Sequence, residues 1–339
     1  MSIIINKGSD GNGGSNSSAM MDSKNGGSSS NSSSSNSNSS STISSSSISS
    51  SNNDGKIFCV IGDPVEHSLS PAMHNAVFSS LGLGYRYIAM RVKEHELSSA
   101  VGMLRDRALG FNVTIPHKIR IMDMLDDLDP LCKRVNAVNT VKVDGTRLKG
   151  YNTDVYGFIQ PLRRRGIGLR GKSVMIMGAG GAARAVLIAL IDEHVGEVMI
   201  ASRRVDDAKV RALYEMAVSN GIECRIVQLE YARMYSKQCY LIVNATPIGM
   251  QGYPGYEGVS ILDSNDIDSR SIVYDLVYRP METRLIRNAI EADAMIIHGY
   301  EMLVEQGAKA LDIWLGIDAP RDVMSNAVLR YLAFGDRHG

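Results

Sequence analysis

The sequence predicts an α/β protein of two domains, the second of them a dinucleotide-binding domain, preceded by a disordered tail. Short apolar strands alternate with helical patterns from about residue 56 onward, a rhythm typical of parallel sheets with crossover helices. A glycine-rich turn follows one of these strands near residue 178. Residues 1–54 are nearly all Ser, Asn and Gly, a composition that buries too little apolar surface to fold.

Composition and charge exclude several classes of function. Lys plus Arg and Asp plus Glu balance at 36 each, so no overall field attracts nucleic acid or an anionic membrane. Neither a signal peptide nor an apolar run of about 18 residues is recognisable in the sequence. The four cysteines lack CxxC spacing, which argues against a zinc site or a disulfide framework: Cys59, Cys132, Cys224 and Cys239. We therefore expect a cytoplasmic protein without a bound metal.

The first folded half is expected to alternate strands and helices. Strands are predicted at 57–61, 85–92, 110–115, 137–143 and 146–148, and helices at 70–81, 94–107, 119–125 and from 152–154 onward. Ser70 before Pro71 predicts an N-cap and helix start. Asp144-Gly145 predicts a two-residue hairpin turn. Thr153 is a predicted cap, and Pro161 a predicted kink.

The second half repeats the alternation of strands and helices, with the spacing along the chain that is typical of a dinucleotide-binding domain. Strands are predicted at 173–177, 197–201, 223–227, 241–244, 271–274 and 294–297. Helices between them supply the crossovers that parallel strands require. Two final helices, at about 300–315 and 320–334, are expected to return and pack on the first half.

The glycine turn has the features of a dinucleotide fingerprint. Strand 174–177 leads into Gly178-Ala179-Gly180-Gly181-Ala182-Ala183, and the spacing Gly178-x-Gly180-x-x-Ala183 fits the fingerprint with a small third residue. The first glycine permits a tight turn, and the second lets the backbone approach a pyrophosphate. N–H groups at the start of the following helix attract anions. We expect a Rossmann-type domain, with a bare strand–turn–helix junction as the alternative.

Polar side chains gather at predicted strand ends and helix starts in the first half. Asn112 and Thr114 alternate on one face of a strand, and Lys118 follows it. Asn139 and Asp154 occupy comparable positions further along. A solvated edge strand and an ordinary helix start are the alternative explanations. Since open α/β folds bind ligands at strand C-termini, the set predicts a site for a small polyol acid.

Together, these motifs resemble the shikimate dehydrogenase family. The segments that carry the resemblance follow the family order from about residue 56 to the C-terminus: 67–75, 112–118, 137–140, 150–154, the glycine turn, 244–250 and 299–307. The resemblance implies reversible reduction of 3-dehydroshikimate to shikimate by a nicotinamide cofactor, a step of aromatic amino acid biosynthesis. It implies a catalytic domain at 55–157, completed by helices at 300–339, and a Rossmann domain at 158–299, after the tail at 1–54.

The resemblance also implies roles for individual residues. Ser68 and Ser70 would hold the substrate carboxylate. The ring hydroxyls would be bound by Asn112, Thr114, Asn139, Asp154 and Gln306, with Tyr278 near the substrate. The cofactor would be bound by Gly178, Ala179, Gly180, Gly181, Ala182, Ser202, Arg203, Arg204, Thr246 and Gly299. Lys118 and Asp154 would form the acid/base pair.

The chemistry of ketone reduction is consistent with this pair. Hydride arriving at a ketone carbon builds negative charge on the oxygen, which a nearby ammonium can stabilise and protonate. Asp154 would hold Lys118 in place and help to return a proton in the opposite direction. We favour Lys118 as the principal group because its stem reaches the reacting oxygen, and Asp154 is the alternative.

The end of the second Rossmann strand decides between the two nicotinamide cofactors. An acidic residue there would bind the ribose 2′-hydroxyl of NAD, whereas arginine accommodates the 2′-phosphate of NADP. This strand ends in Ser202-Arg203-Arg204, which favours NADP. The family's usual Asn-Arg-Thr is altered, and Asp206 and Asp207 follow, so NAD is retained as a secondary cofactor. A solvated helix entry is the alternative explanation for both arginines.

Two other functions are weighed against this one. A quinate/shikimate dehydrogenase with relaxed specificity tends to alter the Ser-x-Ser or Asn-Val-Thr motif, and both are intact here. A shikimate-binding regulator without catalysis is disfavoured by Lys118 and Asp154. The expected partners are the small substrate and the cofactor, with no nucleic acid or membrane, and a homodimer is the assembly to test. The glycine-rich loop 246–258 is expected to flex as the domains close.

Overall fold

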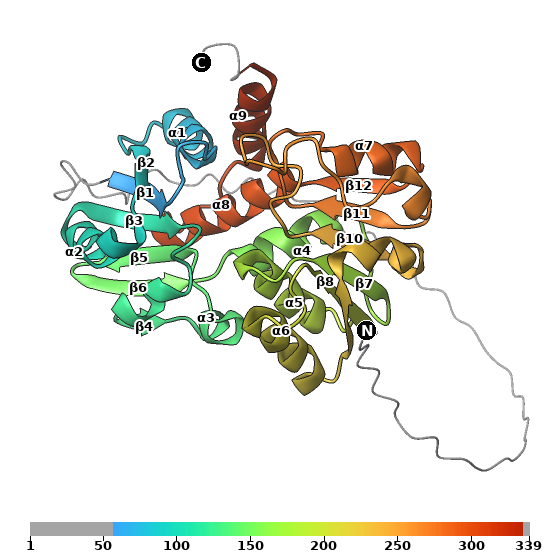
Figure 1. The fold of residues 1–339 in the computed structure, drawn as a ribbon. Helices are drawn as coiled ribbons and strands as arrows, with labels where there is room; N and C mark the ends of the chain where they lie inside the picture. Colours follow the sequence, from blue (N-terminus) through green and yellow to red (C-terminus); the bar gives the residue numbers. More distant parts are fainter. Residues whose placement is uncertain (1–56, 335–339) are drawn as a thin grey trace, which may run out of the picture. The chain divides into compact units, whose positions relative to one another are not determined.

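The structure is a computed structural model that describes residues 57–334. The tail predicted at 1–54 and the end of the segment 300–339 lie outside the described residues. Two six-stranded sheets with helices against them build the described chain, which confirms the predicted α/β class (Figure 1). Among residues 57–334, helices long and apolar enough to cross a bilayer do not occur.

The first sheet is mixed. Its strands are β1 (Ile57–Gly62), β2 (Tyr87–Arg91), β3 (Ala108–Val113), β4 (Asp127–Leu128), β5 (Thr140–Asp144) and β6 (Arg147–Tyr151), in the order β2-β1-β3-β5-β6-β4. Strand β1 runs parallel to β2 and β3, whereas β5 is antiparallel to β3 and β6. The register places Asn112 of β3 opposite Thr140 of β5. The C-terminal end of β3 therefore meets the beginning of β5.

The helices of this half are α1 (Ser70–Ser80), α2 (Leu97–Arg107) and α3 (Pro130–Val135), with 3₁₀ helices η1 (Glu94–Glu96) and η2 (Arg120–Met124). The segment predicted as a helix at 119–125 is thus a 3₁₀ helix. The prediction of Ser70 as an N-cap is wrong, because Leu69 already has helical backbone angles (φ −83°, ψ −6°) and Ser70 is the first helical residue. The hairpin turn is Gly145-Thr146, one residue later than predicted, since Asp144 still pairs with Arg147.

The second sheet is entirely parallel. Its strands are β7 (Ser173–Met177), β8 (Glu197–Ser202), β9 (Glu223–Gln228), β10 (Leu241–Asn244), β11 (Ile272–Asp275) and β12 (Met295–His298), in the order β12-β11-β10-β7-β8-β9. All six predicted strands are confirmed to within two residues. The accompanying helices are α5 (Gly181–Asp192), α6 (Ala208–Ser219) and α7 (Arg284–Glu291), with η3 (Leu229–Met234), η4 (Ser236–Gln238) and η5 (Ser264–Asp266). This is the doubly wound order, with its switch point between β7 and β10.

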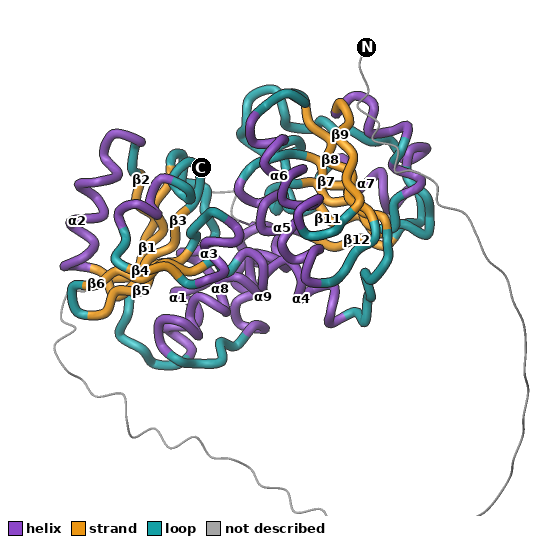
Figure 2. The backbone as a smooth tube through the Cα atoms, turned by 90° about the horizontal axis from the view of Figure 1, so that it is seen from below, coloured by secondary structure: helices purple, strands orange, loops and turns teal. Residues whose placement is uncertain are grey.

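Helices α4 (Asp154–Arg164) and α8 (Gly299–Leu315) connect the two halves, and α9 (Arg321–Phe334) follows α8. Helices α4 and α8 pack side by side (Figure 2). Their approach requires Gly157, since a β-carbon there would lie 2.7 Å from Cβ of Gln306. Helix α9 packs on α1, and one buried cluster joins Phe58 of β1 with α1, α8 and α9. The return of the C-terminal helices to the first half is therefore confirmed.

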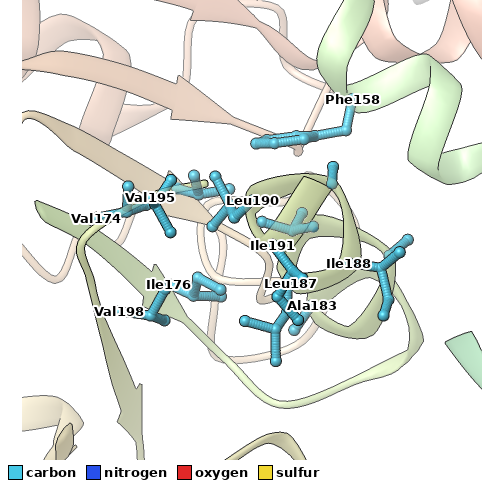
Figure 3. Packing of buried hydrophobic residues seen from close by; sticks show 14 of the residues in the cluster. Phe158, Val174, Ile176, Ala183, Leu187, Ile188, Leu190, Ile191, Val195 and Val198 are labelled. Atoms are coloured by element: carbon cyan, nitrogen blue, oxygen red, sulfur yellow. The ribbon is translucent and has the colours of Figure 1, made fainter. Parts of the chain in front are cut away.

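A second buried cluster holds the beginning of α5 in place. Ile176 of β7, Ala183 and Leu187 of α5, and Phe158 of α4 belong to it (Figure 3). The Phe158 ring also stacks on Tyr274 of β11, with 5.1 Å between ring centroids. Helix α4 is thereby tied to the second sheet by one face and to α8 by Gly157.

Candidate functional site

Lys118 and Asp154 form an ion pair in the first half. Nζ of Lys118 lies 2.6 Å from Oδ2 of Asp154. Lys118 follows β3, and Asp154 is the first residue of α4. The lysine side chain is 17% exposed and the aspartate side chain 7%, so little water screens their attraction. The pair is preformed, and part of the lysine remains open to a ligand.

The start of helix α4 fixes the position of Asp154. Thr153 occupies the N-cap position as predicted, but its side chain does not cap the helix. Instead, Oδ1 of Asn152 accepts hydrogen bonds from the N–H groups of Asp154 and Val155, at 3.1 and 3.4 Å. Pro161 lies within the helix, which continues to Arg164. The Thr153 hydroxyl is thus available to bond Asn139.

Asn139 connects Asp154 to the first sheet. Its Nδ2 donates to Oδ1 of Asp154 at 2.8 Å and to Oγ1 of Thr153 at 2.9 Å. Its Oδ1 accepts from the backbone N–H of Thr153 at 2.7 Å. Asn139 is only 2% exposed. Both amide hydrogens are therefore used within the protein.

Asn112 is the next member of the same buried group. Its Nδ2 donates to the carbonyl of Asn139 at 3.1 Å and to Oγ1 of Thr140 at 3.0 Å. Its Oδ1 accepts from the phenol of Tyr87 at 2.7 Å. With both hydrogens engaged, Asn112 has only a lone pair on Oδ1 to offer to a ligand.

Thr114 lies at the ends of β1 and β3, and the serine motif lies at the start of α1. Oγ of Ser68 accepts from the N–H of Ser70 at 3.3 Å, just before and at the start of α1. The Thr114 methyl group covers Gly62, where an added β-carbon would lie 2.3 Å from Cγ2. Among residues 57–334, the Thr114 hydroxyl makes no hydrogen bond, so it is available to a ligand.

Gln306 and Tyr278 come from the C-terminal part of the chain. Oε1 of Gln306 lies 3.5 Å from Oγ1 of Thr153, and Nε2 donates to the carbonyl of Leu303. Tyr278 is half-buried and packs beside the cluster of β1, α1, α8 and α9, and burial raises its pKa. Gln306 thus joins the group around Asp154, whereas within the described residues Tyr278 has no hydrogen bond to it.

The glycine turn has the geometry of a phosphate cradle. Gly178 has a positive φ of 107°, and a β-carbon there would lie 2.9 Å from the carbonyl oxygen of Ala245. A β-carbon on Gly180 would have no neighbour within 4 Å, which leaves open space over the backbone at the start of α5. This combination of a tight turn and an open helix start suits a pyrophosphate.

The predicted cofactor residues at the end of β8 share a pocket with this turn. The pocket is lined by Ala179, Gly180, Ser202, Arg203, Arg204, Asp207, Lys209 and Val210. Asp207 caps helix α6 by accepting the N–H of Lys209 at 2.8 Å. The Arg203 guanidinium lies over the ring of Tyr256, 5.3 Å from its centroid. Three cations therefore surround the pocket, and one of the two aspartates is occupied in capping.

Thr246 follows β10 at the switch point, whereas Gly299 follows the edge strand β12 and packs against the backbone of Leu276 after β11. Thr246 donates from both its N–H and its hydroxyl to Oδ1 of Asn244, at 3.1 and 2.6 Å. Nδ2 of Asn244 donates to Oδ1 of Asp275, and Thr283 donates to Oδ2. Burial raises the pKa of Asp275 to about 7. Gly299 begins α8 and does not line the pocket described above.

The lysine of the ion pair faces the glycine turn. A β-carbon placed on Gly181 would lie 3.7 Å from Cδ of Lys118. Lys118 of the first half and the start of α5 in the second half are thus neighbours. A ligand on Lys118 and a dinucleotide on the glycine turn would meet at this point.

This arrangement also contains residues that were not assigned to the site from the sequence. Tyr87 and Thr140 connect to Asn112, Thr153 was expected only as a cap, and Lys209 lines the pocket at the end of β8. Thr140 and Thr153 each directly follow an asparagine of a motif, which is a usable signal. Tyr87 has no local signal beyond being an aromatic residue in a strand.

Comparisons with known proteins give a consistent set of relatives. The family model for the shikimate dehydrogenase substrate binding domain matches residues 60–141, and that for the shikimate 5′-dehydrogenase C-terminal domain matches 299–329. A relative named shikimate dehydrogenase (NADP(+)), from Nitrosopumilus maritimus, is 41% identical over 276 residues, which cover 81% of this chain and 98% of the relative.

The similar solved structures are also shikimate dehydrogenases. A shikimate dehydrogenase in complex with NADP+ has a TM-score of 0.75 and 37% identity, covering 83% of this chain and 97% of the other. A shikimate 5-dehydrogenase from Listeria monocytogenes, in complex with shikimate and NAD, has a TM-score of 0.73 and 35% identity, covering 80% and 96%.

Proposed function

The chain belongs to the shikimate dehydrogenase family, and we propose that it catalyses the reversible NADP-dependent oxidation of shikimate to 3-dehydroshikimate. The observation that carries this proposal is the position of the Lys118–Asp154 pair. Its two side chains lie 2.6 Å apart, and Cδ of Lys118 would lie 3.7 Å from a β-carbon on Gly181 in the glycine turn. A hydroxy acid on the pair would be next to a cofactor on the turn.

Lys118 is the proposed proton donor to the reacting oxygen during ketone reduction. In this geometry Oδ2 of Asp154 accepts from Nζ and Oδ1 accepts from Asn139, so both carboxylate oxygens act as acceptors. The ammonium has further N–H groups for the oxygen on which charge develops. In the reverse direction, Lys118 takes the hydroxyl proton back, with Asp154 holding it in position.

The other proposed substrate contacts follow from which polar groups are still free. Ser68 and Ser70 would bind the carboxylate, while the Thr114 hydroxyl and Gln306 would bind ring hydroxyls. Asn112 would only accept a hydrogen bond through Oδ1, and Asn139 would act mainly by holding Asp154, since both its amide hydrogens are used. Tyr278 is proposed to close the site from the β11–α7 segment.

The proposed cofactor is NADP, with NAD as a weaker substitute. The open backbone over Gly180 would take the pyrophosphate, and Arg203, Arg204 and Lys209 would surround the 2′-phosphate. Planar guanidinium groups bind phosphate through paired hydrogen bonds. When bound, the nicotinamide supplies or takes up the hydride. Ser202 and Thr246 would position the adenosine and nicotinamide ends respectively, and Gly299 would keep the backbone close beside β11.

We also propose a cytoplasmic location and the division into domains at 55–157 with 300–339 and at 158–299. The free state of all four cysteines supports a reducing compartment.

The division into domains is supported by the two sheets, each with its own strands and helices.

A two-by-two assay tests the proposed function. Purified protein is given shikimate or quinate, each with NADP+ or NAD+, and formation of the reduced cofactor is followed. We expect kcat/KM to be highest for shikimate with NADP+. Comparable values for quinate would favour the relaxed quinate/shikimate alternative, and shikimate binding without any turnover would favour the regulator.

A further inference from the structure

Tyr87 is a fully buried phenol that no part of the proposed reaction uses. It lies on β2 with 1% exposure. Asn75 of α1 holds its backbone from both sides, accepting from the Tyr87 N–H and donating to its carbonyl, each at 2.8 Å. The imidazole of His74 stacks on its ring, with 4.4 Å between centroids. Helix α1 therefore fixes the phenol in one orientation, and the hydroxyl lies 2.7 Å from Oδ1 of Asn112.

The direction of that hydrogen bond can be assigned from a backbone group. The Asn112 amide lies 3.1 Å from the carbonyl oxygen of Asn139, which can only accept, so the nitrogen of the amide must face it. Oδ1 therefore faces Tyr87, and the phenol must donate. Burial raises the pKa of Tyr87 well above its ordinary value, so the proton stays on the phenol. The second amide hydrogen of Asn112 goes to Oγ1 of Thr140.

A second backbone group assigns the amide of Asn139. The N–H of Thr153 can only donate, so Oδ1 of Asn139 faces it at 2.7 Å. Thr140 has accepted one hydrogen bond and can give its own hydrogen to the same Oδ1 at 3.1 Å. Nδ2 of Asn139 is left to donate to Oδ1 of Asp154 at 2.8 Å. Asp154 is thus held as an acceptor, with Oδ2 free for Lys118.

We infer that Tyr87 is a positioning residue for the Lys118–Asp154 pair, acting through Asn112, Thr140 and Asn139. A buried network in which every donor has an acceptor fixes its members more firmly than isolated pairs do. Removing the phenol hydroxyl leaves Oδ1 of Asn112 without a donor, so the amide is then held only through the two hydrogen bonds that its nitrogen donates. This inference rests on the proposed function, because it concerns the same pair.

The test compares variants that remove one hydroxyl each. Tyr87→Phe and Thr140→Val are expected to lower kcat for shikimate by about ten- to a hundredfold, as a small misplacement of the catalytic groups does. The KM for NADP+ is expected to stay at the wild-type value. Tyr85→Phe is the matched control, because the Tyr85 ring packs edge-on against Phe58 and, among the described residues, its hydroxyl makes no hydrogen bond. Thr140→Ser restores the hydroxyl and is expected to recover the activity lost in Thr140→Val.

Three results would overturn the inference. One is a folded Tyr87→Phe protein whose kcat equals that of Tyr85→Phe, whatever its melting temperature. The second is a wild-type kcat in Thr140→Val, which contradicts the route through Thr140 even if Tyr87→Phe does not fold. A crystal structure of Tyr87→Phe or Thr140→Val gives a readout independent of turnover: we expect the Asn139–Asp154 hydrogen bond to lengthen or break, and an unchanged bond contradicts the inference. Wild-type turnover tests the proposed function separately.

Discussion

Lys118 and Asp154 lie 36 residues apart in the chain, and their side chains are 2.6 Å apart in the fold. Two different elements bring them together. The backbone carbonyl of Lys118 accepts from the N–H of Val138, which ties the segment after β3 to the approach to β5. Asn152 caps α4 and places Asp154 at its first turn. The pair therefore depends on the first sheet and on the helix that leads to the second.

Replacing the carboxylate tests the role of Asp154. In Asp154→Asn, an amide oxygen facing Asn139 would leave an NH₂ group against the Lys118 ammonium, so the lysine loses its anionic partner. We expect kcat to fall by about a hundredfold, within the range for loss of acid/base function. Steady-state kinetics with shikimate measures it, and Asp144→Asn, at the exposed end of β5, is the control. Wild-type kcat in Asp154→Asn would remove the carboxylate from the mechanism.

Cofactor selectivity is expected to depend on Arg203. Charge-assisted hydrogen bonds contribute about 1.5–3 kcal/mol, so Arg203→Ala should raise the KM for NADP+ by about ten- to a hundredfold. The KM for NAD+ should change little, because NAD has no 2′-phosphate. Arg211→Ala, an exposed position on α6 outside the pocket, is the matched control. Equal effects on both cofactors would refute the 2′-phosphate role.

His74 is expected to make the protein sensitive to acid. Burial lowers the pKa of His74 to about 3, from an ordinary value of 6.5. Between these pH values the imidazole is protonated in the unfolded chain but neutral in the native state. Stability is therefore lost as the pH falls from about 6.5 toward 3. His74→Phe removes the titrating group and two buried nitrogens that lack partners among the described residues. Its melting temperature should exceed that of the wild type, increasingly so at lower pH; a constant difference would exclude His74 as the cause.

Asp275 is expected to act in the opposite direction. Its pKa is raised from 3.8 to about 7, chiefly by burial, so between these values the native state keeps a proton that the unfolded chain releases. Its contribution therefore lowers stability progressively as the pH rises from about 4 to about 7. Asp275→Asn cannot titrate and should lose this decline when denaturation midpoints are measured across that range. An unchanged slope would assign the pH dependence to other groups.

The sequence predicted the second sheet closely because its four central strands, β7, β8, β10 and β11, are buried on both faces. Such strands read as short apolar runs, as at Val174–Met177 and Leu241–Asn244. The beginning of β5 was placed too early because Val138 is apolar, yet its N–H bonds the carbonyl of Lys118 rather than a strand. The two-residue strand β4 and the short helix α3 were not predicted, since neither is long enough to show a period.

Site residues that belong to recognisable sequence motifs were predicted. Site residues whose role depends only on a contact with a residue far away in the chain were missed. Lys118 and Asp154 came from the family resemblance, and the structure places them in contact. Tyr87 matters only because Asn112 lies opposite its hydroxyl, 25 residues further along, and no local pattern records that. Lys209 was missed because it lines the proposed cofactor pocket from α6, several residues beyond the strand end on which the cofactor assignment was based.

The most direct measurement of the central claim is the rate of NADPH formation from shikimate and NADP+ by Lys118→Met. The uncharged side chain keeps much of the length of lysine but has no proton to give or accept. We expect kcat to fall by about 10²- to 10⁴-fold with little change in the KM for NADP+, while Lys133→Met, at an exposed position of α3, keeps the wild-type rate. Wild-type turnover in Lys118→Met would contradict the account.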